Sequence, residues 1–249
     1  MIKAILKSGV QRIGWYERAS RLWIRLEPFL VNSTRALTGR NQRLTARYLA
    51  SHAKPALHIG CGDNELRGWL NTELCPRGGQ IYLNAAKPFP FDAGVFSFIY
   101  SEHMIEHISA ADAEAMLGEC FRVMAAGAVL RLVTPNLAFL LRLLEPQPAP
   151  EISAYLGYCI SAHRVPAAVA DGVGVFNTFM REWGHQFIHN ERSLRTLLER
   201  AEFIDIRSCP LSESAHPQLT GLAKVDRMPD GFLSMESFTL EARKPDPRV

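Results

Sequence analysis

The sequence predicts an α/β fold, in which a mostly parallel sheet is covered by helices. From residue 55 onwards, short apolar runs alternate with helical patterns, and residues 95–134 contain a strand, a helix and a strand in that order. This order is typical of α/β proteins. The second of these strands, at residues 128–134, is rich in β-branched residues and closed by Pro135, as expected of a buried central strand.

The other elements follow from similar patterns. Ser109 and Asp112 form a capping box ahead of an apolar repeat with helical spacing, and Gly127 is expected to end that helix. Asn190 is expected to cap a second helix, with Leu194 as its first buried residue. Further strands are expected at residues 56–59, 69–74, 80–83, 203–207 and 238–242.

The first fifty residues differ in charge from the rest of the chain. They carry a net charge of +8, whereas residues 51–249 carry −5, which leaves +3 for the whole. Apolar residues recur at helical spacing between the arginines, with an interruption near Pro28. We expect residues 1–50 to form a basic amphipathic helical arm. It would pack on its own domain or on a second copy, or lie weakly on an anionic membrane surface. The basic charge is confined to this arm, so no nucleic-acid partner is expected.

Composition bears on the expected location. The longest run without a charged side chain is the twelve residues 152–163, shorter than the roughly 18 apolar residues of a membrane span. Basic residues are spread through the N-terminal apolar residues, unlike in a secretory signal. The five cysteines include no CxxC pair, so reduced thiols are expected. These features predict a cytoplasmic protein, with the arm as the site of any contact with the inner face of the membrane.

Residues 146–189 fit neither a strand nor a helix pattern. Prolines interrupt the segment and Gly172 and Gly174 loosen it. An irregular insertion of this length in an α/β domain is usually a lid or a substrate-shaping segment. We expect its aromatic residues to form an apolar wall for an acceptor, namely Tyr155, Tyr158, Phe176, Phe179 and Trp183.

A glycine turn follows the first expected strand. Gly60 and Gly62 would let the backbone approach a ligand closely at a strand end, where open α/β sheets bind nucleotides. The turn lacks the third glycine of a nicotinamide fingerprint, because Glu65 stands there. Glu73 stands near the end of the next strand, where a carboxylate can accept hydrogen bonds from two ribose hydroxyls.

Successive blocks of the chain resemble the class I S-adenosylmethionine-dependent methyltransferases, in particular a small bacterial branch. The blocks are ALHIGCGDNELRGWLNTEL, KPFPFDAGVFSFIYSEHMIEHI, ECFRVMAAGAVLRLVTPN and WGHQFIHNERSLRTLLERAEF, and the resemblance covers about residues 45 to 244. It implies that residues 51–249 form a Rossmann-like, seven-stranded, mostly parallel sheet with helices on both faces, and that S-adenosylmethionine is the cofactor. It implies contacts with this cofactor from His58, Gly60, Cys61, Gly62, Glu73, Leu74, Asn84, Ala85, Ser101, Glu102 and His103.

Within this resemblance, Gly60 and Gly62 would lie against the methionine part and Glu73 on the ribose. Asn84 and Ala85 would lie beside the adenine, with residues 101–103 at the mouth of the methyl-transfer site. The chain departs from the family pattern in several places. His58 stands where an acid usually holds the methionine ammonium group. Asn84 and Ser97 each replace an aspartate, and residues 125–127 replace the usual KPGG. Residues 62–69 are also too few for a crossover helix, which needs about a dozen residues or more.

Histidines provide the candidate catalytic groups. His103, Glu106 and His107 match H-x-x-E-H, a zinc-peptidase signature. That motif needs a long helix, but here it lies between a strand and a helix cap, so we expect no metal on these three residues. His103 is instead expected to face the pocket, and His185, at the end of the lid, is the second candidate for a general base.

The leading hypothesis from the sequence is therefore a methyltransferase with a small-molecule acceptor, such as a sugar hydroxyl or an amine. A hydroxyl acceptor needs a base to remove its proton, whereas a neutral amine does not. The alternative is a non-catalytic binding or scaffold protein that keeps the fold, which the departures at His58, Asn84 and Ser97 favour. A zinc hydrolase that uses His103, Glu106 and His107 ranks third.

Overall fold

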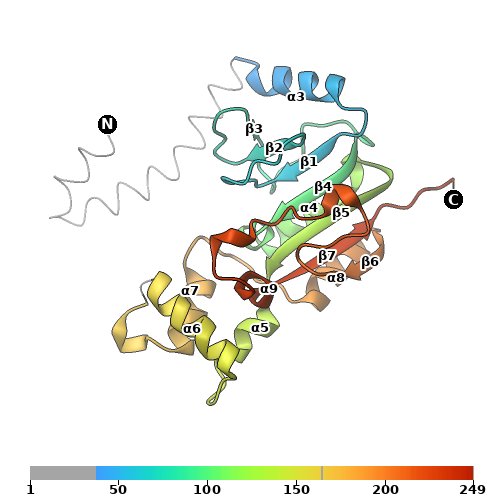
Figure 1. The fold of residues 1–249 in the computed structure, drawn as a ribbon. Coiled ribbons are helices and arrows are strands. Elements are labelled where there is room, and N and C mark those ends of the chain that lie inside the picture. Colours follow the sequence, from blue (N-terminus) through green and yellow to red (C-terminus); the bar gives the residue numbers. More distant parts are fainter. Residues whose placement is uncertain (1–37, 164, 249) are drawn as a thin grey trace, which may run out of the picture.

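The computed structural model describes residues 38–163 and 165–248, which form a seven-stranded sheet flanked by helices (Figure 1). The strand order is β3-β2-β1-β4-β5-β7-β6. All the pairs from β3 to β5 are parallel, and β7 runs antiparallel to both β5 and β6. The predicted seven-stranded, mostly parallel sheet is confirmed. The strands are β1 (Ala56–Ile59), β2 (Leu70–Glu73), β3 (Ile81–Tyr82), β4 (Phe96–Glu102), β5 (Met124–Pro135), β6 (Ile204–Ser208) and β7 (Ser237–Arg243).

The helices lie between and beyond these strands. The α-helices of the described residues are α3 (Arg40–Ser51), α4 (Ala110–Val123), α5 (Leu137–Arg142), α6 (Pro150–Ala162), α7 (Gly172–Arg181), α8 (Glu191–Arg200) and α9 (Phe232–Glu236). Short 3-10 helices are η1 (Ile105–His107), η2 (Ala167–Val169), η3 (Pro217–Leu219) and η4 (Val225–Arg227). None of the helices in this part of the chain is long and apolar enough to cross a membrane.

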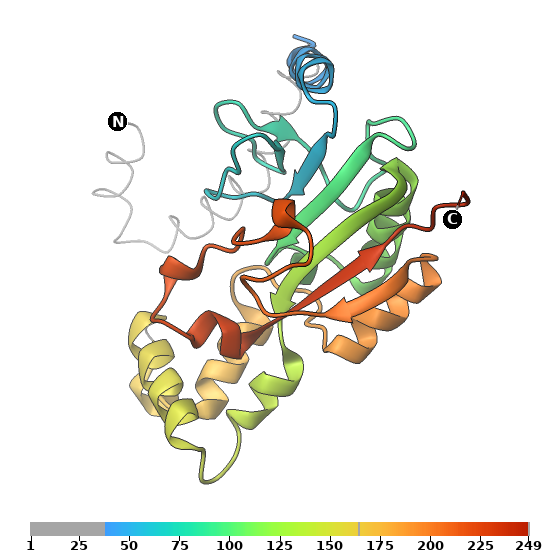
Figure 2. The same ribbon diagram turned by 45° about the vertical axis from the view of Figure 1, so that its right-hand side comes forward.

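The main core lies between the sheet and helices α4 and α8. The buried face of α4 includes Met116, Leu117 and Cys120, which pack in one cluster with Leu194 and Leu198 of α8. The other face of the sheet is covered differently. Tyr100 of β4 and Val133 of β5 pack against residues from the chain between β6 and β7. We call residues 209–236 the cap segment, which Figure 2 shows crossing the sheet on its way to α9.

The two predicted helix starts are confirmed, but one helix end is not. The Ser109 side chain accepts a hydrogen bond from the backbone N–H of Asp112, and Asn190 and Ser193 form a reciprocal capping box. Helix α4 ends at Val123, before Gly127, and β5 begins at Met124. Gly127 lies in an irregular stretch of the β4–β5 pairing with φ of 74°, a conformation that suits glycine.

No helix connects β1 to β2, as the short spacing predicts, and side-chain hydrogen bonds hold this connection instead. Asn71 Oδ1 accepts from the backbone N–H of Leu66 at 2.9 Å, and its Nδ2 donates to the carbonyls of Leu66 and Trp69. The same Oδ1 lies 3.1 Å from Nδ1 of His58. A crossover helix would satisfy the backbone N–H and C=O groups of this connection internally, and here the side-chain amide of Asn71 satisfies several of them instead.

Residues 146–189 are more regular than the sequence predicts. They include α6 and α7, which with α5 form a helical lid around its own apolar cluster (Figure 2). Pro150 is tolerated because it stands in the first turn of α6, where its missing N–H costs no hydrogen bond. Gly172 and Gly174 allow close packing of the backbone. A Cβ at Gly172 would come within 2 Å of the Leu143 carbonyl oxygen, and one at Gly174 within 2 Å of the Val169 carbonyl oxygen. The expectation of an irregular segment is therefore wrong, since the prolines and glycines have positional roles.

Most of the expected N-terminal arm lies outside the described residues. Its last part, α3, packs beside β3, and the Tyr48 hydroxyl accepts a hydrogen bond of 2.9 Å from the backbone N–H of Ala56. This end of the arm is thus tied to the start of β1.

Candidate active site

The candidate site lies where the parallel strands end, beside β1 and β4. These neighbouring strands mark the switch point of the sheet, because the chain continues from β1 to β2 on one side and from β4 to β5 on the other. In open α/β sheets the ligand crevice lies outside the carboxyl ends of the strands at this point. The glycine turn follows β1 and the H-x-x-E-H residues follow β4, so the topology brings both motifs to this edge.

The glycine turn is braced by Glu73 at the end of β2. The Glu73 carboxylate accepts hydrogen bonds from the backbone N–H groups of Gly62, at 2.9 Å, and Leu74, at 2.7 Å. Both glycines of the turn have positive φ, 66° at Gly60 and 52° at Gly62. A Cβ at residue 60 would lie 2.3 Å from Cγ of Met104, whereas one at Gly62 would meet nothing within 4 Å. Any residue larger than glycine at position 60 would therefore clash with Met104. The space beside Gly62 is open.

These residues fit the ribose and adenine parts of S-adenosylmethionine. A carboxylate has about four lone-pair directions, so Glu73 can accept from ribose hydroxyls in addition to the two backbone donors. Leu74 follows it with 42% of its surface exposed, as suits a residue that packs against a planar base. Asn84 borders a pocket of about 540 Å³ between α3 and residues 81–92, and its Oδ1 accepts from the N–H of Ala86.

Three of the residues that the resemblance assigns to the cofactor lie in the interior. His58 is 1% exposed, and burial lowers its pKa to about 4, so the ring is neutral near pH 7. Cys61 is also buried, and burial raises its pKa to about 12, mainly by desolvation and then by the charge of Glu73. Ser101 is buried and donates to the carbonyl oxygen of Ile59. Any contact of these three with the cofactor would have to come from the backbone.

The side chain of Glu102, which the resemblance assigns to the cofactor, also holds the cap segment. Its buried carboxylate faces the cap segment, with Oε2 3.4 Å from the backbone nitrogen of Lys224 and Oε1 3.6 Å from the Arg227 guanidinium. Arg131, fully buried in β5, donates to the carbonyl oxygens of Pro210 and Leu211 at the start of the same segment. These two charged residues fasten the cap segment over the sheet.

His103 stands at the end of β4 with both ring nitrogens in contact with polar groups. Its Nε2 lies 2.9 Å from the Ser237 hydroxyl, and its Nδ1 lies 3.3 Å from Oε1 of Glu106. Glu106 is completely buried, and its other oxygen accepts from the Thr134 hydroxyl at 3.0 Å. Burial would raise the pKa of the Glu106 carboxyl, but hydrogen bonding and charge from His103 outweigh it, and the pKa is lowered. His103 has φ of 48°, which holds its ring at the strand end.

The end of the lid is bonded to these residues. The backbone N–H of Gln186 donates to the Glu106 carbonyl at 2.7 Å, and the Gln186 side chain donates to the carbonyl of His107. His185 is oriented by a 2.6 Å hydrogen bond between Nδ1 and the Phe179 carbonyl, and its ring centroid lies 4.8 Å from that of His107. Burial lowers the pKa of His107. His185 of the lid therefore lies in one cluster with Glu106 and His107 of η1.

Together these elements enclose what we call the histidine pocket, of about 260 Å³. Its lining residues are His103, Glu106, His107, Pro135, His163, Phe179, Trp183, His185, Arg227, Met228 and Glu236. Both histidines predicted to be catalytic, His103 and His185, are among them. Of the five aromatics expected as an apolar wall, Phe179 and Trp183 line this pocket. Tyr155 is fully buried in the lid core and donates to Glu236, while Tyr158 and Phe176 pack against that core.

Four lining residues escaped the sequence analysis. His163 and Glu236 carry no local motif, and Arg227 and Met228 belong to the cap segment, whose polar, Pro- and Gly-containing sequence is typical of a surface loop. The 3.6 Å contact with Glu102 helps to bring Arg227 to the pocket.

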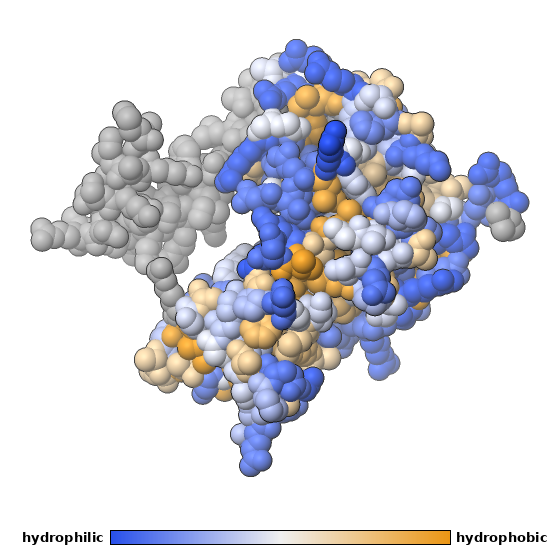
Figure 3. All heavy atoms as spheres, viewed as in Figure 1, coloured by the Kyte–Doolittle hydropathy of each residue, from blue (hydrophilic) through white to orange (hydrophobic). Residues whose placement is uncertain are grey.

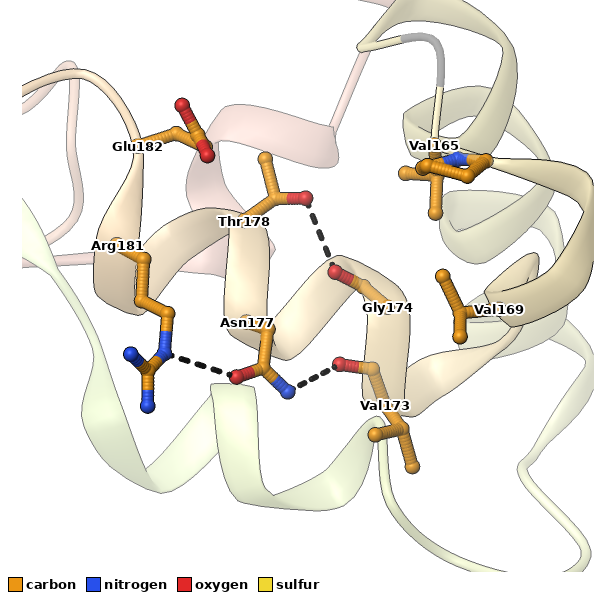
Figure 4. Close-up of a pocket in the computed structure, with 9 residues that line it drawn as sticks. Val165, Val169, Val173, Gly174, Asn177, Thr178, Arg181 and Glu182 are labelled. Carbon is orange, nitrogen blue, oxygen red and sulfur yellow. Dashed lines mark hydrogen bonds between the residues drawn. The ribbon is translucent and has the colours of Figure 1, made fainter.

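A second hollow, of about 250 Å³, lies on the lid between α7 and η2 (Figure 4). Within α7, Thr178 donates to the Gly174 carbonyl and Asn177 donates to that of Val173. The charged residues of the lining are Arg181 and Glu182.

No family model matches the chain, and no curated protein matches it. Solved structures with a similar fold include a SAM-dependent methyltransferase from Archaeoglobus fulgidus, with 15% identity, a TM-score of 0.47, and coverage of 84% of this chain and 94% of that one. Another is a SAM-dependent methyltransferase from Thermotoga maritima, described as a possible histamine N-methyltransferase, with 15% identity, a TM-score of 0.43, and coverage of 89% and 99%.

A third is phosphoethanolamine N-methyltransferase 2 of Haemonchus contortus, with 12% identity, a TM-score of 0.41, and coverage of 84% of this chain but 53% of that one. At this level of identity the likeness concerns the fold alone. Any function assigned to this chain therefore rests on its own strand order and on the geometry of its own site.

Proposed function

We propose that this protein is an S-adenosylmethionine-dependent methyltransferase that acts on a hydroxyl group of a small-molecule acceptor. The observation that carries the proposal is the short link between the glycine turn and His103. A Cβ at Gly60 would lie 2.3 Å from Cγ of Met104, which packs against the main core and adjoins His103 in the chain. A donor held over the turn and an acceptor held in the pocket would therefore be neighbours, which is the main requirement for methyl transfer.

Glu73, Leu74 and the open face of Gly62 would hold the cofactor. When bound, S-adenosylmethionine supplies a methyl group on a positively charged sulfur, and the protein contributes position and exclusion of water. Phe179 and Trp183 line one side of the histidine pocket, and the cap segment adds Met228. These apolar groups would shield the acceptor from solvent.

His103 is the group best placed to remove the proton of the acceptor hydroxyl. With its proton on Nδ1, it offers the Nε2 lone pair to a hydroxyl, as it does to Ser237 at 2.9 Å. An acceptor hydroxyl would take the place of Ser237 as the donor. The buried carboxylate of Glu106, 3.3 Å from Nδ1, would stabilise the imidazolium that forms. His185 faces the same pocket and is the second candidate for this step.

The first test concerns the cofactor. Calorimetric titration of the full chain with S-adenosylmethionine should show saturable binding, and Glu73→Ala should weaken it about tenfold or more, because a charge-assisted hydrogen bond contributes about 1.5 to 3 kcal/mol. Asp63→Ala is the matched control, since this exposed acid lies in the same turn and pairs with Arg77 among the residues that the structure describes. Absence of binding at millimolar cofactor would overturn the proposal.

The second test separates the base from the fold. Asparagine tolerates the positive φ of His103 and can still donate toward Glu106, but it has no equivalent of the Nε2 lone pair. His103→Asn should therefore lower turnover with a hydroxyl acceptor about 100-fold while leaving cofactor affinity unchanged. Unchanged turnover would mean that His103 is not the base, and His185→Asn would then be tested in the same assay.

The alternative of a non-catalytic binding protein has one specific observation in its favour. His58 stands where an acid is expected, and it is buried and neutral. Cofactor binding without methyl transfer to any hydroxyl or amine acceptor would favour this alternative.

A further inference from the structure

The structure brings together three potential metal ligands that the sequence does not group. Glu106 and His107 lie in η1, and His185 lies at the end of the lid, 78 residues further along the chain. One ligand atom from each can be chosen so that all three lie within 4.8 Å of one another. This trio differs from the H-x-x-E-H reading, because His185 replaces His103.

The side chains of the trio are held as metal ligands usually are. A metal-binding histidine commonly gives its second ring N–H to a carbonyl or carboxylate, which fixes the tautomer and directs the other nitrogen to the metal. His185 Nδ1 is bonded to the Phe179 carbonyl at 2.6 Å, which leaves Nε2 as a lone-pair donor. The His107 ring packs edge-on to the His185 ring, with the two centroids 4.8 Å apart.

The carboxylate gives a second, independent indication. Glu106 is completely buried, and its Oε1 lacks a hydrogen-bond partner among the described residues, although His103 Nδ1 lies 3.3 Å away. An unsatisfied buried carboxylate oxygen is costly unless a cation or a donor completes it. Its neighbour Oε2 is occupied by Thr134, so a metal ion would bind at Oε1 and replace the 3.3 Å contact of that oxygen with His103 Nδ1.

We propose that Glu106, His107 and His185 bind one divalent transition-metal ion, with Zn²⁺ as the best fit, and leave a coordination position open to the histidine pocket. Two imidazoles and one carboxylate with an open position form a recognised catalytic zinc set. Zinc bonds of about 2.0–2.2 Å place tetrahedral ligand atoms about 3.4 Å apart. The trio must therefore contract from its present spacing by side-chain rotation, since the bonds from Gln186 to the carbonyls of Glu106 and His107 already tie the end of the lid to η1.

The chemical class of the further ligand follows from the pocket. The open position would face a space lined by His103, Arg227 and Glu236, which suits an oxygen ligand such as a hydroxyl or carboxylate of a small molecule. If the proposed methyl transfer is correct, the ion would also lower the pKa of a bound acceptor hydroxyl. The binding of the metal itself does not depend on that reaction.

The test uses the full chain, stripped of metal by chelation and titrated with Zn²⁺ in the absence of cofactor and acceptor. We expect one equivalent to bind, and Co²⁺ to give the visible absorption of a low-symmetry site. His185→Asn keeps a donor for the Phe179 carbonyl but has no equivalent of Nε2, so it should lower Zn²⁺ affinity about 100-fold or more. Glu106→Gln should do the same.

His163→Ala is the matched control, because His163 lines the same pocket but lies outside the trio. It should retain the full equivalent of Zn²⁺. Thermal unfolding and circular dichroism of each variant without metal identify any that is misfolded. A rise in melting temperature with Zn²⁺ in the wild type and His163→Ala, but not in His185→Asn or Glu106→Gln, would support the site. No saturable Zn²⁺ binding by the wild type, or an equal loss in His163→Ala and His185→Asn, would overturn it. Because no cofactor is present, failure here is distinguishable from failure of the methyltransferase proposal.

Discussion

Acidification should destabilise this protein through His58. The ring is 1% exposed, its Nδ1 lies 3.1 Å from Asn71 Oδ1, and its centroid lies 5.1 Å from that of Tyr100. Burial lowers its pKa to about 4, against 6.5 for an exposed histidine. Below pH 6.5 the His58 ring therefore binds a proton in the unfolded chain but not in the native one. The free energy of unfolding is highest above pH 6.5 and falls as the pH is lowered towards 4.

The size of the effect follows from the shift. One pKa unit corresponds to about 1.4 kcal/mol, so the full loss is about 3 kcal/mol, of which about 2 kcal/mol falls between pH 7 and pH 5. Burial also lowers the pKa of His189 to about 4, so the wild type should lose more than His58 alone accounts for. A variant that removes only the His58 ring isolates the contribution of His58 to the loss of stability.

The assay is urea unfolding at pH 7 and pH 5 for the wild type and His58→Asn. The asparagine amide can donate to Asn71 but does not titrate, so the variant should lose about 2 kcal/mol less than the wild type between the two pH values. His216→Asn, at a half-buried ring beside Phe98, should behave as the wild type. An equal loss in the wild type and His58→Asn would refute the reasoning.

Three further changes test other features. Gly174→Ala places a Cβ 1.9 Å from the Val169 carbonyl and should cost about 1–3 kcal/mol in urea unfolding, whereas Gly157→Ala, with nothing within 4 Å, should be neutral or stabilising by up to about 1 kcal/mol. Arg131→Met leaves Glu241 and three backbone carbonyls without their buried donor, and should cost about 3–5 kcal/mol; a loss below about 1 kcal/mol would contradict the role assigned to Arg131. Truncation of residues 1–30 should abolish co-sedimentation with anionic vesicles, which salt should weaken in the full chain because each basic residue near the surface contributes about 1 kcal/mol; equal pelleting with neutral vesicles would count against a membrane contact.

The central strands were predictable from the sequence because they contain apolar runs with clear ends. β1 ends at Ile59, directly before Gly60, and β5 ends at Pro135, as expected. The lid helices were not predictable from residue types alone. Pro150 counts as a helix breaker by composition but stands in the first turn of α6, and Gly174 is present because Val169 approaches its backbone.

The site was only half predictable, for a related reason. His103 and His185 could be found because each adjoins a recognisable block of sequence. Arg227 could not, because its place depends on a contact with Glu102 at a separation of 125 residues. Glu102 itself was assigned to the cofactor, since no local pattern distinguishes an acid that faces a ligand from one that fastens a distant loop.

The bonds between the lid and η1 also limit how molecules can enter and leave. Because Gln186 is bonded to the backbone of both Glu106 and His107, the wall that carries His185 moves together with the end of β4. Apolar side chains are visible on the surface of the lid (Figure 3), and its interior is a separate apolar cluster, so outward movement of the lid would bring more apolar surface to water. The opposite wall, Arg227 and Met228, belongs to the cap segment, which Arg131 holds at its start. Nearer the pocket, the segment is held by the 3.6 Å ion pair of Arg227 with Glu102 and by the 3.4 Å contact of the Lys224 N–H with the same carboxylate. We expect small molecules to enter and leave the pocket on that side, at a rate that depends on how long the Glu102–Arg227 pair stays closed.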